Sequence, residues 1–126
     1  MATIKSYTDL KQSKKLAEIL PLESADMYYT HGAIVPDIMI GSKQDYRCYT
    51  ICWSLAALYN ILPNTEYNST TLSRGGWKIE PPEYVDTWFC EYEDGDDCTR
   101  DITVEADNPV NACYEMIIKL HKLNLL

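Results

Sequence analysis

The sequence lacks long hydrophobic runs. None of its 126 residues lies in a stretch that approaches the roughly 20 consecutive apolar residues of a membrane-spanning helix. The first fifteen residues contain four lysines and no apolar segment, so we expect no signal peptide. These two absences predict a cytoplasmic protein that does not bind a membrane.

The sequence also lacks the motifs of the common cofactor and metal sites. It has five glycines and neither a GxGxxG nor a Walker pattern, which excludes the usual phosphate-binding loops. A structural zinc site needs two closely spaced pairs of ligands, and only Cys48 and Cys52 form such a pair. We therefore predict no cofactor and no metal, while a loose cation site at Asp94, Asp96 and Asp97 stays an alternative.

Cysteines occur in an odd number, five, and without an export signal they predict reduced thiols instead of a disulfide framework. Cys52 and Trp53 together resemble the nucleophile segment of papain-like proteases. However, Tyr46 stands six residues upstream, where those enzymes carry glutamine, and the only downstream histidine is His121, close to the C-terminus. We interpret Cys48 and Cys52 as small buried side chains and predict no catalytic residue. A small enzyme with a Cys-centred site is an alternative.

Basic residues are nearly absent from residues 80–107. Arg100 is the only one there, although the net charge of the whole chain is −8. Charge concentrated in one segment predicts an acidic surface, which repels nucleic-acid backbones and anionic membranes and attracts a basic partner. The segment contains eleven carboxylates: Glu80, Glu83, Asp86, Glu91, Glu93, Asp94, Asp96, Asp97, Asp101, Glu105 and Asp107.

The apolar pattern predicts three helices. The first is expected over residues 9–20, with Thr8 as its N-terminal cap. The second is expected over residues 48–62, which are apolar nearly all round and therefore typical of a buried central helix. The third begins after Asp107 or Asn108. Its predicted inward stripe is Cys113, Met116, Ile117, Leu120 and Leu123.

Short strands are expected between these helices. Pro36 favours an edge position for the second of them, because proline lacks the backbone N–H that an inner strand donates. The strands are predicted at residues 27–30, 34–40, 69–72 and 77–80.

Residues 84–93 and 98–106 predict a hairpin that turns near Gly95. Because side chains alternate between the faces of a strand, a loop with an odd number of residues places the aromatic face of the first strand opposite Ile102 and Val104. We therefore expect a three- or five-residue loop with a bulge at Gly95.

This order of elements predicts a single α+β domain over residues 1–126. We expect a small antiparallel sheet of three to five strands and about three helices, which lie mainly on one face of the sheet.

Three segments cover both ends and the centre of the chain: YTDLKQSKKLAEILPLESADM (residues 7–27), CWSLAAL (residues 52–58) and DNPVNACYEMIIKLHKLNLL (residues 107–126). They resemble a family of short uncharacterised proteins encoded by Bacteroides-type gut bacteria and by their phages or mobile elements. The resemblance implies an origin in a bacterial cytoplasm or a phage-infected cell. It implies no activity, cofactor or site residue.

The function predicted from these observations is protein–protein interaction. We expect a small cytoplasmic interaction protein whose acidic face, within residues 80–107, binds a basic protein surface and not nucleic acid directly. An acidic nucleic-acid mimic that inhibits a DNA-binding enzyme is an alternative. The predicted partner-binding residues are Glu91, Glu93, Asp94, Asp96 and Asp97.

Overall fold

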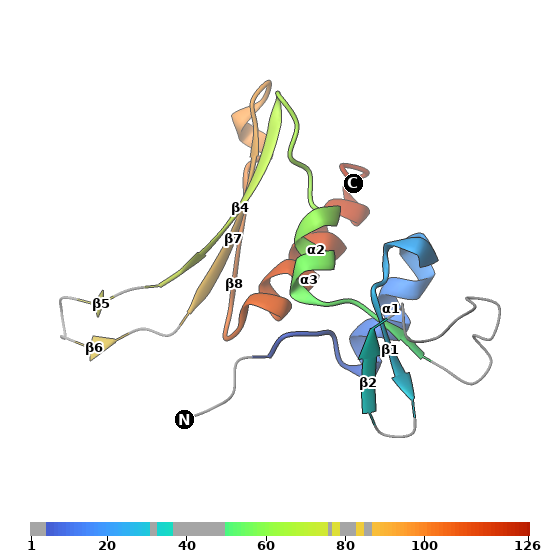
Figure 1. Cartoon of the computed structure of the whole chain (residues 1–126). Helices are drawn as coiled ribbons and strands as arrows, with labels where there is room; N and C mark the ends of the chain where they lie inside the picture. Colours follow the sequence, from blue (N-terminus) through green and yellow to red (C-terminus); the bar gives the residue numbers. More distant parts are fainter. Residues whose placement is uncertain (1–4, 31–32, 37–49, 76, 79–82, 85–86) are drawn as a thin grey trace. The chain divides into compact units, whose positions relative to one another are not determined.

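Three α-helices and eight short β-strands form the described part of the chain, which confirms the predicted α+β class (Figure 1). The computed structural model describes residues 5–30, 33–36, 50–75, 77–78, 83–84 and 87–126. The chain divides into two compact units, one formed by Ser6–Ile61 and the other by Leu62–Leu126 together with Lys5.

Helix α1 (Leu10–Ile19) opens the first unit, and its N-terminal cap is Asp9. The Asp9 carboxylate accepts a hydrogen bond from the backbone N–H of Gln12 (2.8 Å), and the Gln12 side chain accepts one from the backbone N–H of Asp9 (3.1 Å). Thr8 was the predicted cap, and this prediction is wrong. Its hydroxyl is buried and accepts a hydrogen bond from the backbone N–H of Trp53 (3.1 Å), so it does not cap α1.

Strands β1 (Met27–Thr30), β2 (Ala33–Pro36) and β3 (Thr50–Cys52) form an antiparallel sheet in the order β2-β1-β3. The predicted strand at residues 27–30 is confirmed. Pro36 ends an edge strand, as predicted, and pairs with Met27. Residues 37–40 of the predicted second strand lie outside the described residues.

The helix predicted over residues 48–62 is replaced by strand β3 and a shorter helix, α2 (Leu55–Ile61). Ser54 marks the change, because its hydroxyl accepts a hydrogen bond from the helix backbone (3.1 Å), as N-terminal caps do. Leu58 is fully buried, whereas Tyr59 is 43% exposed, so the helix is not apolar all round. The apolar run before Ser54 is thus a buried strand, which periodicity alone does not distinguish from a helix.

The second unit contains a three-stranded antiparallel sheet in the order β4-β7-β8, built from β4 (Asn68–Arg74), β7 (Trp88–Asp94) and β8 (Ile102–Ala106). Strand β7 is central, which the sequence did not predict. Strands β5 (Trp77–Lys78) and β6 (Glu83–Tyr84) form a separate two-stranded pair.

Helix α3 (Pro109–Lys122) packs on β7 and β8 and covers one face of this sheet (Figure 1). Asn108 is its N-terminal cap, as predicted, and accepts a hydrogen bond from the backbone N–H of Asn111 (2.8 Å). Four members of the predicted stripe are buried. The fifth, Leu123, is 57% exposed because it follows the last helical residue.

The predicted pairing of the hairpin is confirmed: Cys90 pairs with Val104, and Tyr92 with Ile102. The loop is longer than predicted. It comprises residues 95–101, between Asp94 and Ile102, and contains the short 3₁₀ helix η4 (Cys98–Arg100). The prediction of an odd number of loop residues was right, because the apolar faces of the two strands must lie on the same side of the sheet. The length of the loop depends instead on hydrogen bonds within it.

Candidate functional site

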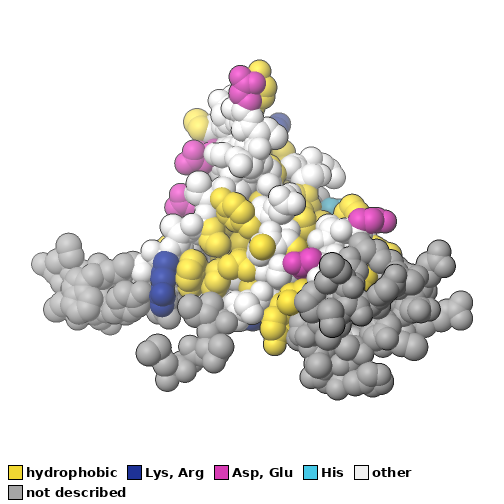
Figure 2. Space-filling model, in the orientation of Figure 1, with side chains coloured by type: hydrophobic (Ala, Val, Ile, Leu, Met, Phe, Trp, Pro, Cys, Tyr) yellow, Lys and Arg dark blue, Asp and Glu magenta, His cyan; other side chains and the backbone are white. Residues whose placement is uncertain are grey.

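The face of the sheet opposite α3 is acidic. Along β7 and β8 the buried side chains of Cys90, Tyr92 and Val104 alternate with those of three glutamates, which therefore lie on the opposite face. We call Glu91, Glu93 and Glu105 the acidic outer face. Glu93 and Glu105 are exposed and Glu91 is partly exposed. Figure 2 shows acidic side chains (magenta) at the tip of this sheet and along its side away from α3.

The neighbours of these glutamates on the sheet are uncharged. Glu91 lies between Thr71 on β4 and Thr103 on β8, Glu93 pairs with Ser69, and Glu105 pairs with Phe89. Among the residues that the structure describes, none of the three glutamates forms an ion pair with Lys or Arg. The acidic outer face thus carries charge that is not neutralised within this part of the chain.

The aspartates of the hairpin loop have a different role. Asp94 is only 8% exposed, and its Oδ1 accepts hydrogen bonds from the backbone N–H groups of Asp96 (3.0 Å) and Asp97 (3.2 Å). The Asp101 carboxylate accepts one from the backbone N–H of Asp94 (3.0 Å). Asp94 and Asp101 therefore hold the loop in shape.

Asp97 is also bonded within the loop. The hydroxyl and backbone N–H of Thr99 donate to its carboxylate, and these hydrogen bonds lower the pKa of Asp97. Of the five predicted partner-binding residues, Glu91 and Glu93 lie on the acidic outer face and Asp96 is exposed in the loop. The carboxylates of Asp94 and Asp97 accept hydrogen bonds from residues of the loop itself.

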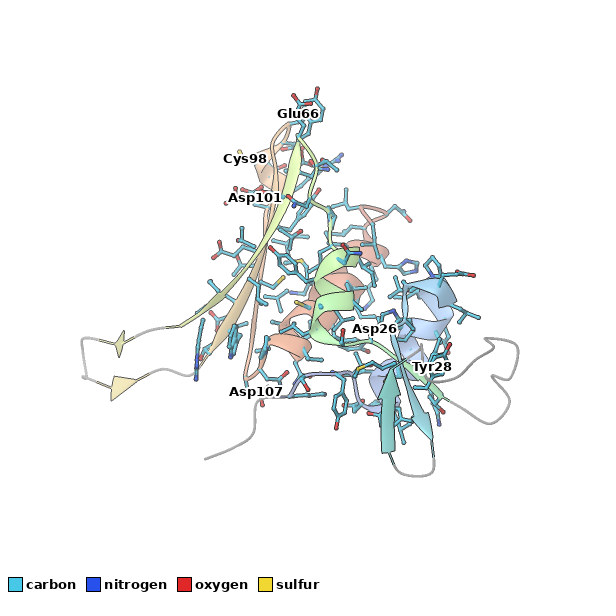
Figure 3. All side chains as sticks on the ribbon, in the orientation of Figure 1. Asp26, Tyr28, Glu66, Cys98, Asp101 and Asp107 are labelled. Carbon is cyan, nitrogen blue, oxygen red and sulfur yellow. The ribbon has the colours of Figure 1, made fainter. Side chains whose placement is uncertain are left out.

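Gly95 lies against the segment that precedes β4. Its N–H donates to the carbonyl oxygen of Tyr67 (2.7 Å), and a Cβ atom on Gly95 would lie 2.5 Å from that oxygen. The longer loop of residues 95–101 replaces the predicted bulge-type turn, and the close approach of two backbones explains why position 95 is a glycine. Figure 3 shows Glu66, Cys98 and Asp101 at this end of the sheet and Asp107 at the other end.

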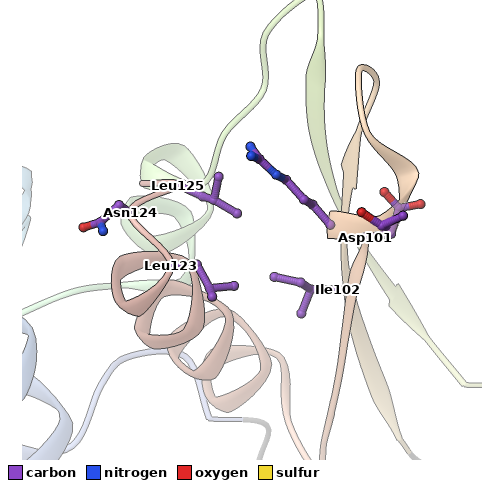
Figure 4. Close-up of a pocket in the computed structure, with 7 residues that line it drawn as sticks. Asp101, Ile102, Leu123, Asn124 and Leu125 are labelled. Carbon is purple, nitrogen blue, oxygen red and sulfur yellow. The ribbon is translucent and has the colours of Figure 1, made fainter.

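A pocket of about 450 Å³ lies beside the acidic loop, lined by residues 99–102 and 123–125. In Figure 4, Ile102 faces Leu123 and Leu125 across the gap, while the carboxylate of Asp101 points away from it. The sequence analysis missed this pocket. No local sequence motif marks it. Residues 99–102 form one wall and residues 123–125 the other, and the two walls meet only because α3 packs on β8.

Residues 123–125, which form one wall of the pocket, also form the C-terminal cap of α3. Asn124 has a left-handed backbone (φ 57°), and its N–H donates to the carbonyl oxygen of His121 (3.1 Å), while the N–H of Leu125 donates to that of Leu120 (2.9 Å). These two bonds define a Schellman motif. They fix the positions of Leu123 and Leu125 relative to α3.

The described cysteines are Cys52, Cys90, Cys98 and Cys113, and all but Cys98 are buried. They are free thiols, as predicted, and Cys48 lies outside the described residues. Cys52 is fully buried, and burial together with the charge of Asp26 raises its pKa to about 12, so it is not a thiolate at neutral pH. Cys90 and Cys113 are hydrogen-bonded to each other in the core between β7 and α3; this bond and burial raise the pKa of Cys113.

The described residues contain no group of three or more His, Cys, Asp or Glu side chains able to hold a metal ion, and the loop aspartates form no such group. No helix in the described ranges is long and apolar enough to cross a membrane.

Comparison of the chain with known protein families, curated proteins and solved structures found no match. Conclusions about function therefore depend on the chain's own geometry.

Proposed function

We propose that this protein is a small cytoplasmic interaction protein, of bacterial, phage or mobile-element origin, that binds a basic protein surface through its acidic outer face. One observation carries the proposal: Glu91, Glu93 and Glu105 share one face of a sheet, their cross-strand neighbours are uncharged, and none of the three forms an ion pair with a Lys or Arg in the described part of the chain. Like charges on one sheet face repel each other, and a basic partner removes this repulsion.

A nucleic-acid mimic is supported less well by the spacing of the charges. Glu91 and Glu93 are separated by two residues of an extended strand, which is about 6.8 Å. A nucleic-acid strand carries one phosphate about every 3.4 Å along the helix axis. The acidic outer face thus has about half that linear charge density, and its lateral spread over two strands suits a protein surface better.

A Cys-centred enzyme is supported least. Cys52 is fully buried with a raised pKa, and Cys90 and Cys113 are core residues of the second unit. None of these thiols is both accessible and ionised at neutral pH, and a nucleophilic cysteine requires both.

The proposal is tested by affinity capture with tagged protein from a lysate of a Bacteroides-type gut bacterium. The test variant carries Glu91→Gln, Glu93→Gln and Glu105→Gln, which remove the charge of the acidic outer face and keep side-chain size. We expect this variant to lose the captured basic protein. Because exposed charges are screened over about 8 Å at physiological ionic strength, raising the salt concentration should also release it from the wild type.

The matched control carries Glu18→Gln, Glu23→Gln and Glu115→Gln, which remove the same number of carboxylates from exposed positions of helical segments. Retention of the partner by the control, with its loss by the test variant, supports the acidic outer face as the binding surface. Equal capture by both variants contradicts it. Release of the partner by competing duplex DNA would favour the mimic instead.

A further inference from the structure

Strand β8 is an edge of the three-stranded sheet. In the order β4-β7-β8 it pairs with β7 on one side and with no other strand of the described chain. Successive residues of an antiparallel strand direct their N–H and C=O groups to opposite sides, so every second residue of β8 directs them away from β7. Within the described ranges these outward groups have no backbone partner. Such an edge is a template for a further strand.

The two faces of β8 differ in chemistry. Thr103 and Glu105 are exposed on the acidic outer face, whereas Val104 is buried on the face that α3 covers. Ile102 lies on the same face as Val104 and lines the pocket. A strand added to β8 would continue both faces, because its side chains alternate in the same way. They would point in turn towards the glutamates and towards α3.

The pocket accommodates a side chain that points towards α3. Ile102 faces Leu123 and Leu125 across the gap (Figure 4), and the neighbour of Ile102 on an added strand would lie about 5 Å from it on the same face. The pocket volume of about 450 Å³ is ample for an aliphatic side chain. Arg100 also lines the pocket and the Asp101 carboxylate points away from it, so a cation is disfavoured on this side.

The other face favours cations. Glu105 belongs to β8 itself, so the residue next to it on an added strand would be a direct cross-strand neighbour about 5 Å away. Opposite charges at such positions stabilise a sheet, and like charges destabilise it. Strand β4, the other edge, contains no carboxylate and ends at Arg74. A basic strand is therefore favoured at β8.

We propose that β8 binds an extended segment of the basic partner, which adds a fourth strand to the sheet with its cations on the acidic outer face and its aliphatic side chains towards the pocket. The inference rests on the proposed function and specifies how the partner is bound. The glutamates and the pocket lie on opposite faces, and an extended strand reaches both because its side chains alternate. A second copy of β8 is disfavoured, since edge-to-edge pairing would bring the acids of two copies together.

The first test compares two acetylated and amidated pentapeptides of the same composition, Lys-Leu-Lys-Leu-Lys and Leu-Leu-Lys-Lys-Lys. Each is titrated into the ¹⁵N-labelled full chain and followed by NMR. Both peptides carry three positive charges, but only the first can direct its leucines to one face and its lysines to the other. We therefore expect it to bind about tenfold more tightly. It should shift the amide signals of Ile102, Thr103 and Glu105.

The second test concerns the hydrogen bonds of the edge. Because only every second N–H of an added strand faces β8, the alternating peptide is also made with N-methyl groups on its two leucines, or on its second and third lysines. We expect one of these two peptides to lose affinity about tenfold, because its methyl groups remove two hydrogen bonds. The other should keep the affinity of the unmodified peptide.

The pocket is tested by Leu123→Ser, which changes an exposed side chain and leaves the core intact. Leu10→Ser is the matched control, since Leu10 is 49% exposed and does not line the pocket. We expect Leu123→Ser to reduce the preference for the alternating peptide and Leu10→Ser to preserve it. Well-dispersed spectra of both variants show that they are folded.

Four results would overturn the inference, and they differ in what they say about the proposed function. Equal affinity for the two unmodified peptides, lost in the variant without the acidic outer face, would leave the proposed function standing. The same affinity of both methylated peptides would exclude a paired strand. Shifts of β8 signals when the protein alone is concentrated would indicate a second copy as occupant. If neither unmodified peptide binds, the inference fails, and the proposed function fails with it only when that variant captures the basic protein as well as the wild type does.

Discussion

Gly95 is the residue whose replacement has the clearest structural consequence. A Cβ atom there would lie 2.5 Å from the Tyr67 carbonyl oxygen, and relieving this contact breaks the 2.7 Å hydrogen bond between the two backbones. We expect Gly95→Ala to lower the free energy of unfolding by about 1–3 kcal/mol. The measurement is urea unfolding, with Asp96→Ala at the next, exposed position as control. Equal stability of the two variants would contradict the close approach.

Two tyrosines provide a matched test of hydrogen bonding. The hydroxyl of Tyr92 is buried with no partner in the described part of the chain, whereas that of Tyr29 donates to the Thr8 carbonyl oxygen (2.7 Å). Replacing an unsatisfied hydroxyl removes a desolvation cost, so Tyr92→Phe should leave stability unchanged or raise it. Tyr29→Phe should lose about 1 kcal/mol. Urea midpoints measure both, and a larger loss for Tyr92→Phe would mean that its hydroxyl has a partner.

Cys52 predicts how stability depends on alkaline pH. Its pKa is raised from 9.0 to about 12 by burial and by Asp26, so the folded state keeps a proton that the unfolded state releases. The sign is therefore a loss of stability as pH rises above 9, by at most about 1.4 kcal/mol per pH unit. Unfolding measured between pH 8 and 10 should show this slope. Cys52→Ala should make this slope smaller without removing it, because the pKa of Cys113 is also raised, and the exposed Cys98→Ala should leave it unchanged.

At the scale of elements, the C-terminal cap of α3 allows the clearest test of stability. Asn124 has a left-handed backbone, which costs most side chains about 1 kcal/mol and glycine nothing. We expect Asn124→Gly to raise the free energy of unfolding by a few tenths of a kcal/mol to about 1 kcal/mol, and Asn124→Ala to lower it. Thermal unfolding distinguishes these outcomes. A more stable alanine variant would argue against the Schellman motif.

The same scale shows what sequence reasoning predicts well. Asn108 as a cap and the pairing of Tyr92 with Ile102 were predictable, because capping and the alternation of faces depend on near neighbours. The strand within residues 48–62 was not, since an apolar run suits a buried strand and a buried helix equally. The central place of β7 and the pocket also escaped, because both depend on contacts between distant segments.

At the scale of the whole molecule, the charge pattern was readable from the sequence and its arrangement was not. The structure separates the acids into two groups with different roles. Glu91, Glu93 and Glu105 lie on an open sheet face, whereas Asp94 and Asp97 are held by bonds within the loop. Alternation along β8 places Glu105 with Glu91, so the sequence contained a signal for this residue too. That residues 1–126 form a single folding domain stays a prediction.

The central claim is that the acidic outer face binds a basic partner, and the salt dependence of affinity tests it most directly. The dissociation constant of the captured partner is measured by titration calorimetry at several salt concentrations, for the wild type and for the variant with Glu91→Gln, Glu93→Gln and Glu105→Gln. The account predicts that the wild-type affinity falls as salt rises and that the variant binds more weakly with a smaller salt dependence. The same affinity and the same salt dependence in both proteins would contradict it.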